Sequence, residues 1–226
     1  RLTRNIDCLK GIESGDTDLE PAVFAVAEGI EHSAEHNELF FGSEFQDGYG
    51  WIFPRDGVEV NIGFVLGKNV QHKEPLRKKL LDFIAKDYPQ AKVKAVYGGM
   101  IACGQSTRPM AMCGLFKAGD AASCMNPISR SGIVEALLCG TIVAGSVNEW
   151  LDAKSEDERE SVERSVLDRW MKALGKSHLQ LQRAKAGFNS ITDEQFDRAA
   201  EKLSKLPREK QTLFRIFFTV LRTCPS

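Results

Sequence analysis

The first half of the chain alternates between short apolar runs and turn residues, which predicts β-strands. The clearest run is residues 58–64, where apolar and polar residues alternate without a break. Its apolar members, expected on one buried face, are Val58, Val60, Ile62 and Phe64. The preceding Arg55-Asp56-Gly57 predicts a tight turn, because glycine adopts the positive φ that such turns need. We therefore expect residues 49–54 and 58–64 to pair as an antiparallel hairpin.

Shorter runs extend this hairpin to a small sheet domain. Further strands are expected at residues 22–27, 38–41 and 92–97, and Gly98-Gly99 is expected to end the last of them. Residues 76–84 have helical spacing with a basic outer face, which predicts one helix against the sheet. The mixed pattern indicates an α+β fold whose sheet is antiparallel.

After Gly132 the pattern becomes helical. Four helices are expected, at residues 133–151, 155–183, 193–206 and 208–221. The second is charge-rich and carries an apolar stripe of Val162, Val166, Trp170 and Leu174. The last is rich in Phe and Leu, which suits a packed core, a cover over an apolar ligand or contact with a membrane surface. This part of the chain therefore predicts an all-helical cap.

Composition and charge exclude some classes of protein. The 226 residues carry a net charge of −1 with both signs mixed along the chain, so no basic patch marks a nucleic-acid partner. A hydrophobic content of 42% allows a substantial core. The longest apolar stretch, residues 133–144, is expected to be too short to span a bilayer and contains Glu135. With no signal peptide evident, we expect a cytoplasmic protein.

The cysteines and histidines do not predict a metal site. The six cysteines are scattered without a CxxC pair, so zinc and iron–sulfur clusters are not expected and the thiols are expected to be reduced. Cys103 and Cys124 lie where a redox role is open, beside the simpler interpretation of small buried hydrophobes. His32 and His36 have helical spacing but no third ligand, which favours a solvated surface pair.

Residues 115–132, LFKAGDAASCMNPISRSG, predict a short strand, a tight turn and the start of a helix. Gly119 permits a close approach of the backbone, and Asp120 offers a carboxylate to sugar-like hydroxyls. The helix start near Gly132 directs unpaired N–H groups and the positive end of its dipole at the turn. A reduced flavin, with ribityl hydroxyls and negative charge, satisfies both features. An ordinary capped strand-turn-helix is the alternative.

The order of these residues resembles the second flavin-binding motif of the para-hydroxybenzoate-hydroxylase-like flavoproteins. It is especially similar to the geranylgeranyl reductase family, whose usual form is GDAAGxxNPxxGxGI. The matching positions are Gly119, Asp120, Ala121, Ala122, Asn126, Pro127, Gly132 and Ile133, and the resemblance assigns all of them except Ala122 to FAD binding. Arg130 departs from the motif, because the family usually has a small residue there. We call residues 119–133 the flavin turn.

A second segment, residues 48–54 (GYGWIFP), resembles the YxWxFP segment of the same family, which borders its lipid channel. In a strand, Tyr49, Trp51 and Phe53 project to one face and Ile52 to the other. The resemblance implies that the three aromatic side chains wall the binding site of an isoprenoid lipid. Taken alone, the three side chains suit the core of a sheet.

The resemblance implies the C-terminal part of an FAD-dependent oxidoreductase. Its expected reaction reduces isoprenoid double bonds with hydride from flavin N5, and NAD(P)H or another reductant supplies the electrons. The expected partners are a prenyl lipid and, peripherally, a membrane. No residue stands out as catalytic, and Tyr49 as proton donor is a guess. The implied segments are a substrate-binding sheet domain (1–114), a second FAD segment (115–151) and a helical region (152–226).

Flavoproteins with this motif also carry an N-terminal GxGxxG fingerprint, which this chain lacks. We therefore expect the chain to be part of a longer protein and to be inactive alone. Three alternatives stay open. Flavin monooxygenases and halogenases share the turn and would consume oxygen. Electron-transfer flavoprotein dehydrogenases would add a cysteine cluster that is missing here, and a lipid-binding scaffold would lack the nucleotide half altogether.

Overall fold

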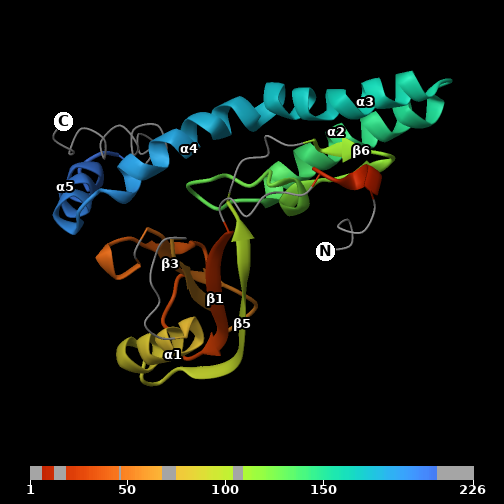
Figure 1. Ribbon diagram of the computed structural model, residues 1–226. Coiled ribbons are helices and arrows are strands. Elements are labelled where there is room, and N and C mark those ends of the chain that lie inside the picture. Colours follow the sequence, from red (N-terminus) through yellow and green to blue (C-terminus); the bar gives the residue numbers. More distant parts are fainter. Residues whose placement is uncertain (1–6, 13–18, 46, 68–74, 104–108, 208–226) are drawn as a thin grey trace. The chain divides into compact units, whose positions relative to one another are not determined.

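The computed structural model describes residues 7–12, 19–45, 47–67, 75–103 and 109–207. They form two compact units (Figure 1). The turn unit comprises residues 1–19 and 101–185, and the sheet unit comprises residues 20–100 and 186–226. The three segments expected from the sequence, residues 1–114, 115–151 and 152–226, remain a prediction. The predicted helix at residues 208–221 lies outside the described residues.

The sheet unit contains a five-stranded sheet with the strand order β2-β3-β4-β1-β5. Its strands are β1 (Leu19–Glu28), β2 (Glu38–Phe40), β3 (Tyr49–Pro54), β4 (Glu59–Val65) and β5 (Lys92–Ala102). Antiparallel pairing joins β2 to β3, β3 to β4, and β4 to β1. The predicted hairpin is confirmed, since the Arg55 amide donates to the Glu59 carbonyl over 2.9 Å and Gly57 has a φ of +67°.

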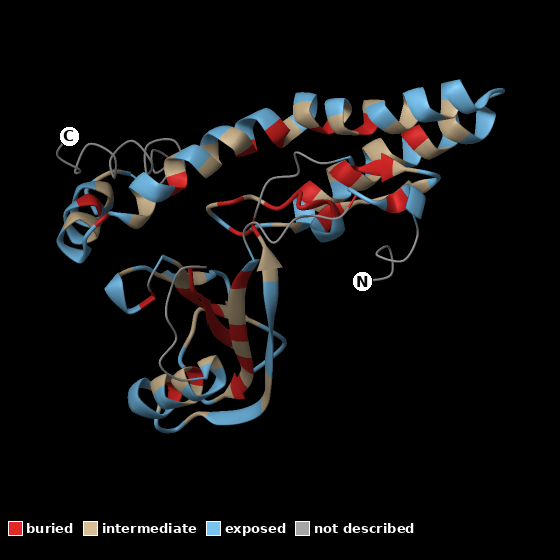
Figure 2. Cartoon of the chain, viewed as in Figure 1, coloured by how far each residue is buried: buried red, intermediate tan, exposed pale blue. Residues whose placement is uncertain are grey.

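One face of the sheet forms the core of this unit against α1 (Leu76–Asp87). Buried and less buried residues alternate along β1 (Figure 2). The main buried side chains are Val23, Ala25, Ala27, Ile52, Val60, Ile62, Phe64, Leu80 and Ile84. Burying each large apolar side chain contributes about 1.5–3 kcal/mol. The prediction for Val58 was wrong: it is 67% exposed, because β4 begins only at Glu59 and Val58 belongs to the turn.

Strand β5 continues through Gly98-Gly99, so the expectation that this pair ends the strand was also wrong. A Cβ on Gly98 would lie 3.3 Å from the carbonyl oxygen of Ala22 in β1. The glycine therefore permits a close approach between neighbouring backbones inside the sheet.

The remainder of the sheet unit comes from the short helix η2 (Ser43–Phe45), the end of α4 (Lys176–Asn189) and α5 (Asp193–Ser204). Helix α5 begins with a capping box. The hydroxyl of Thr192 accepts from the Gln195 amide, and the Gln195 side chain accepts from the Thr192 amide over 2.8 Å. This reciprocal pair fixes where the predicted helix at residues 193–206 starts.

The turn unit is mostly helical. Its elements are η1 (Asp7–Leu9), β6 (Ala111–Met112), β7 (Leu115–Phe116), η3 (Gly119–Ala122), α2 (Ile133–Asp152), α3 (Glu156–Trp170), the π-helical turn η4 (Met171–Gly175) and most of α4. The predicted helix at 155–183 runs unbroken through η4 and continues to Asn189. Helices α2 and α3 pack together over a cluster of Met110, Ala111, Ala122, Cys124, Cys139, Val166 and Trp170.

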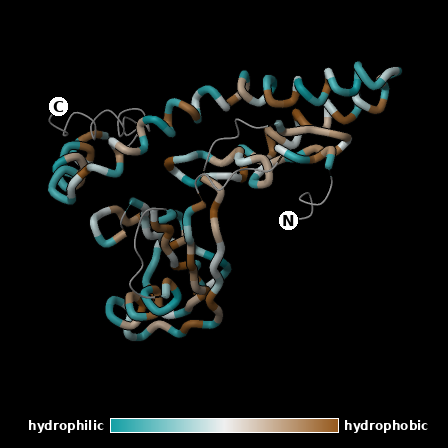
Figure 3. Tube along the Cα trace, viewed as in Figure 1, coloured by the Kyte–Doolittle hydropathy of each residue, from teal (hydrophilic) through white to brown (hydrophobic). Residues whose placement is uncertain are grey.

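Helix α2 is more apolar over its length than expected. It has 20 residues and a mean hydropathy of 1.2, so by length and composition it is able to cross a membrane (Figure 3). The expectation of a stretch too short for this was wrong, because the helix continues without a break past Ala144 to Asp152, although Asn148 and Glu149 lie in this last part. At its start, Ile133, Val134 and Leu137 are exposed.

Candidate functional site

The ten residues expected to bind the cofactor and the lipid fall into two groups, one in each unit. Seven lie in the flavin turn of the turn unit. The other three lie on β3 of the sheet unit. Among the described residues, no group of three or more His, Cys, Asp or Glu side chains is placed to hold a metal ion.

Gly119 begins the flavin turn and is buried in a left-handed conformation, with a φ of +56°. A Cβ at this position would lie 3.2 Å from the Cβ of Ala136 in α2. The Gly119 carbonyl accepts from the Cys124 amide over 3.1 Å, and the Asp120 carbonyl accepts from the Ser123 amide over 3.0 Å. Glycine is required here both for its φ and for the close contact between turn and helix.

Asp120 is exposed, and its carboxylate forms no hydrogen bond within the described part of the chain. A carboxylate oxygen lies 3.5 Å from the position a Cβ would take on Gly132, the residue before α2. No side chain caps α2 at Gly132. An exposed acceptor therefore lies beside the uncapped N–H groups of a helix start. Ala121 and Ile133, which flank this place, are also exposed.

Asn126 and Pro127 shape the loop between the turn and the helix. The side-chain oxygen of Asn126 accepts from the amides of Ile128 and Ser129, each over 3.0 Å. Its main chain bonds Ser131 and Arg130, and Pro127 is buried. These contacts give Asn126 a structural role, as the residue that closes the loop.

Arg130 shows why the family usually has a small residue at its position. It has a φ of +55°, a conformation that favours glycine, and its side chain is buried. The guanidinium donates to the Ile128 carbonyl over 2.7 Å. Arginine is thus accommodated by folding back onto its own loop, at the cost of a strained backbone.

A cysteine pair that sequence reasoning missed joins the flavin turn to α2. The Cys124 and Cys139 sulfur atoms lie 3.4 Å apart, and both residues are fully buried. The contact with Cys139 and burial raise the pKa of the Cys124 thiol. The hydrogen bonds from Cys124 and the Gly119 backbone lower the pKa of Cys139 to about 7, against the effect of burial. Only Cys124 had been singled out, because the fold brings a helix residue 15 positions away against it.

The second group forms the aromatic face of the sheet, opposite the α1 side. The ring centroid of Trp51 lies 5.9 Å from Tyr49 and 5.8 Å from Phe53, so the predicted alternation along β3 is confirmed. The Trp51 indole donates to the Asn61 side-chain oxygen over 2.9 Å. Trp51 is buried, whereas Tyr49 and Phe53 are half-buried.

Gly63 on β4 is a further residue of this face that sequence reasoning missed. It pairs with Trp51 in the sheet register, and a Cβ on it would lie 2.7 Å from the indole ring. The glycine therefore lets the indole approach the backbone of the neighbouring strand closely. The signal in the sequence is the glycine itself, because a glycine inside a predicted strand marks a position without room for a side chain.

The flavin turn fits the group that the resemblance implies. Asp120 is an acceptor without a hydrogen bond to the described residues and could accept from ribityl hydroxyls, and the uncapped start of α2 offers N–H donors to an electron-rich ring. Gly119 keeps the turn close to α2. These are the features of a polar clamp for a flavin.

Comparison with known proteins finds matches to one family. Residues 18–101 match the family model of the geranylgeranyl reductase catalytic domain. Over 209 residues the chain is 30% identical to a digeranylgeranylglycerophospholipid reductase from Methanosarcina acetivorans, a match that covers 88% of this chain and 51% of the relative. The chain spans about half the length of the curated relatives it matches.

Solved structures show the same fold. A geranylgeranyl bacteriochlorophyll reductase-like protein from Thermoplasma acidophilum superposes with a TM-score of 0.82 at 20% identity, over 95% of this chain and 54% of that one. The flavin-dependent brominase Bmp2 superposes with a TM-score of 0.53 at 13% identity, over 90% and 55% of the two chains. The fold is thus one that flavin-dependent proteins use.

The fold and the two motifs together match about half the length of these geranylgeranyl reductase-like proteins. The chain is similar to members of the geranylgeranyl reductase family, as the resemblance of the flavin turn and the aromatic strand implied.

Proposed function

We propose that the protein containing this chain is an FAD-dependent oxidoreductase that reduces the double bonds of isoprenoid lipids. The observation that carries the proposal is the joint presence of a polar clamp at Asp120 and Gly132 and an aromatic face on β3. The relatives that the chain matches are named as digeranylgeranylglycerophospholipid reductases.

Each group of residues has a separate task in this proposal. Asp120 accepts hydrogen bonds from the ribityl hydroxyls, and the uncapped start of α2 stabilises negative charge on the ring. Tyr49, Trp51 and Phe53 bind the prenyl chain by apolar contact and exclude water from it. Bound FAD would supply the hydride that an isolated double bond requires. NAD(P)H or another reductant would be the source of the electrons.

The place of action follows from the substrate. A prenyl lipid resides in a membrane, so the proposal includes peripheral contact between a cytoplasmic protein and a membrane surface. The exposed Ile133, Val134 and Leu137 at the start of α2 are apolar, but they serve equally well to pack against the remainder of a longer chain.

The test uses the full-length protein. Its visible absorption spectrum should show the two bands of an oxidised flavin. After chemical reduction without oxygen, a geranylgeranyl lipid should restore those bands and gain two hydrogens per double bond, as measured by mass spectrometry. A monooxygenase or halogenase, which the similarity to a brominase raises, would instead need oxygen before its flavin reoxidises. A colourless protein that takes up no FAD would contradict both functions.

A further inference from the structure

Two cysteines meet in the core of the turn unit, one from the flavin turn and one from α2. The Cys124 thiol donates to the Cys139 sulfur over 3.4 Å, so the two sulfur atoms are in contact. Both are free thiols, and the proposed function uses neither of them. A disulfide requires the sulfur atoms to approach by about 1.4 Å, to a separation of about 2.0 Å. Rotation of the two side chains supplies a movement of this size, so the contact is the starting arrangement for a disulfide.

The pair is closed off from solvent. Both cysteines are fully buried in the apolar cluster beneath α2 and α3. Cys8 and Cys113, which belong to the same unit, are exposed. A bulky oxidant such as glutathione disulfide therefore reaches Cys8 and Cys113 but not the buried pair. Hydrogen peroxide is little larger than water, and a small oxidant of this class is the one that a buried pair admits.

The surroundings distinguish the two sulfur atoms. Hydrogen bonds from the Cys124 thiol and from the Gly119 backbone lower the pKa of Cys139 to about 7, although burial acts in the opposite direction. The contact with Cys139 and burial raise the pKa of the Cys124 thiol. The thiolate is the nucleophilic form of a cysteine. Cys139 is therefore the sulfur that reacts first, and Cys124 is the thiol that waits beside it.

We propose that Cys124 and Cys139 form a peroxide-sensitive pair whose disulfide locks the flavin turn to α2. The Cys139 thiolate attacks one oxygen of hydrogen peroxide, the O–O bond breaks, and a sulfenic acid forms on Cys139. The departing hydroxide takes up the proton that the Cys139 thiol had released. The Cys124 sulfur then attacks the Cys139 sulfur, and the sulfenic oxygen leaves as water with the Cys124 proton. Two thiols and one peroxide thus give one disulfide and two water molecules.

The disulfide closes a loop that contains most of the flavin turn. The loop runs from Cys124 to Cys139 and includes Asn126 and Gly132. The Cys124 amide donates to the Gly119 carbonyl over 3.1 Å, so the cross-link also restrains the start of the turn. A cross-link restricts the unfolded chain and the local opening of the loop that it closes. We therefore expect the oxidised turn to open less often, whether or not FAD is bound.

The test is peptide mass spectrometry on full-length protein treated with hydrogen peroxide and then alkylated. Trypsin cleaves after Lys117, Arg130 and Lys154, which leaves each cysteine of the pair alone in its peptide, 118–130 or 131–154. Peroxide should join these two peptides with the loss of two hydrogens, and dithiothreitol should separate them. Glutathione disulfide at the same concentration should give at least roughly tenfold less of the joined peptides, because the pair is buried.

The lock has its own measurements. In the oxidised protein without FAD, amide hydrogen exchange across residues 119–133 should slow by at least about threefold. The midpoint of thermal unfolding should rise by at least about 3 °C. Both changes should disappear when dithiothreitol reduces the disulfide.

Single variants test the role of each sulfur. In Cys124→Ala, peroxide should convert Cys139 to a sulfinic acid, because no second thiol reaches its sulfenic acid. In Cys139→Ala, Cys124 should remain a thiol under the same treatment. Cys113→Ser is the matched control, since it removes an exposed cysteine of the same unit. The joined peptides should form in this variant as in the original protein.

The possible outcomes separate the pair from the proposed function. Absence of the joined peptides when peroxide has oxidised the exposed Cys113 would overturn the proposal. Joined peptides with unchanged hydrogen exchange would overturn the lock, and oxidation of Cys124 in Cys139→Ala would overturn the order of attack. A protein that forms the disulfide but takes up no FAD would keep the pair and reject the proposed function. A protein that reduces a prenyl lipid but never forms the disulfide would reject the pair alone.

Discussion

The flavin turn and the aromatic face both carry residues of the predicted site, yet they are built in different ways. In the turn, the buried residues Gly119, Ser123 and Arg130 have φ values of +56°, +52° and +55°. The shape of the turn therefore comes from left-handed backbone conformations at these three positions. The aromatic face uses the regular backbone of β3, and its shape comes from alternating side chains.

Under the proposed function, this difference follows from what each part would bind. A polar cofactor is recognised by hydrogen bonds whose directions depend on fixed backbone atoms. An apolar chain is held by buried area, which several rings supply together. We therefore expect a single substitution in the flavin turn to cause a large loss of FAD binding. A single substitution in the aromatic face should reduce lipid binding only in part.

The largest effect is expected at Gly119. In Gly119→Val the side chain meets Ala136, at a φ that costs about 1–2 kcal/mol for a residue with a Cβ. Overpacking adds about 1–3 kcal/mol. The variant should unfold earlier on heating and copurify with little flavin. Gly57→Val is the control, because Gly57 has a φ of +67° but open space around it. Equal losses in both variants would mean that the contact with α2 is unimportant.

A smaller effect, confined to the cofactor, is expected at Asp120. Asp120→Ala removes a charged acceptor, worth about 1.5–3 kcal/mol in hydrogen bonding, so FAD should bind roughly tenfold to a hundredfold more weakly. The midpoint of thermal unfolding without FAD should stay the same, because the exposed carboxylate makes no hydrogen bond in the described chain. Asp120→Asn keeps an acceptor and should lose less. Unchanged FAD affinity in the alanine variant would contradict the flavin clamp.

The aromatic face should respond more mildly. Phe53→Leu keeps most of the apolar area at a half-buried position, a change that costs less than about 1.5 kcal/mol. The KM for a geranylgeranyl lipid should rise less than roughly tenfold, and flavin content should not change. Phe53→Ser removes the area and should raise KM further at the same flavin content. If both variants instead lose structure while KM is unaffected, Phe53 fills a core and does not touch the lipid.

How much of the fold and of the candidate site the sequence predicts depends on whether a feature is set by a local pattern or by a tertiary contact. The hairpin of β3 and β4, the alternation of Tyr49, Trp51 and Phe53, and the start of α2 are local patterns, and all are confirmed. The local errors concern ends of elements: Val58 falls outside β4, and Gly98 continues β5. At both positions the pairing of neighbouring strands decides the outcome, and a single run of residues does not contain that information.

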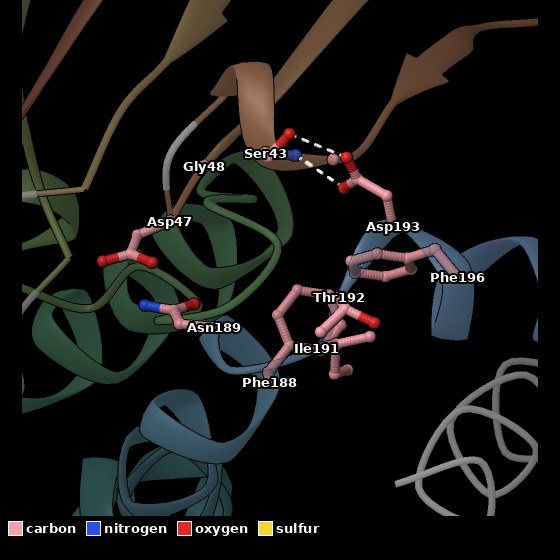
Figure 4. A pocket seen from close by; sticks show the side chains of 10 residues that line it. Ser43, Asp47, Gly48, Phe188, Asn189, Ile191, Thr192, Asp193 and Phe196 are labelled. Atoms are coloured by element: carbon pink, nitrogen blue, oxygen red, sulfur yellow. Dashed lines mark hydrogen bonds between the residues drawn. The ribbon is translucent and has the colours of Figure 1, made fainter.

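The features that the sequence did not predict all join distant residues. Cys124 meets Cys139 across the turn and helix α2. Ser43 bonds Asp193, which lies 150 positions further along the chain. No periodicity or spacing in the sequence predicts such contacts, because only the tertiary fold brings the residues together. Motif resemblance located the flavin turn and the aromatic strand, but it did not indicate the pocket that Ser43 and Asp193 line (Figure 4).

The smallest effect is expected from a change of pH, which should alter the stability of the turn unit alone. His178 is buried in α4, with its ring 5.7 Å from that of Trp170 in the core beneath the flavin turn. Burial lowers the pKa of His178 below its ordinary value of 6.5, although the charge of Glu135 acts in the opposite direction. The folded state therefore binds a proton less readily than the unfolded state.

The sign of the pH effect follows from this order. Above pH 6.5 the histidine is neutral in both states, and the unit has its full stability. As the pH falls below 6.5, the unfolded state takes up a proton first, so stability is lost until the lowered pKa is reached. His178→Phe keeps a ring against Trp170 and should remove this slope from urea unfolding between pH 7 and pH 5. A slope that persists in the variant would place the titrating group elsewhere in the protein.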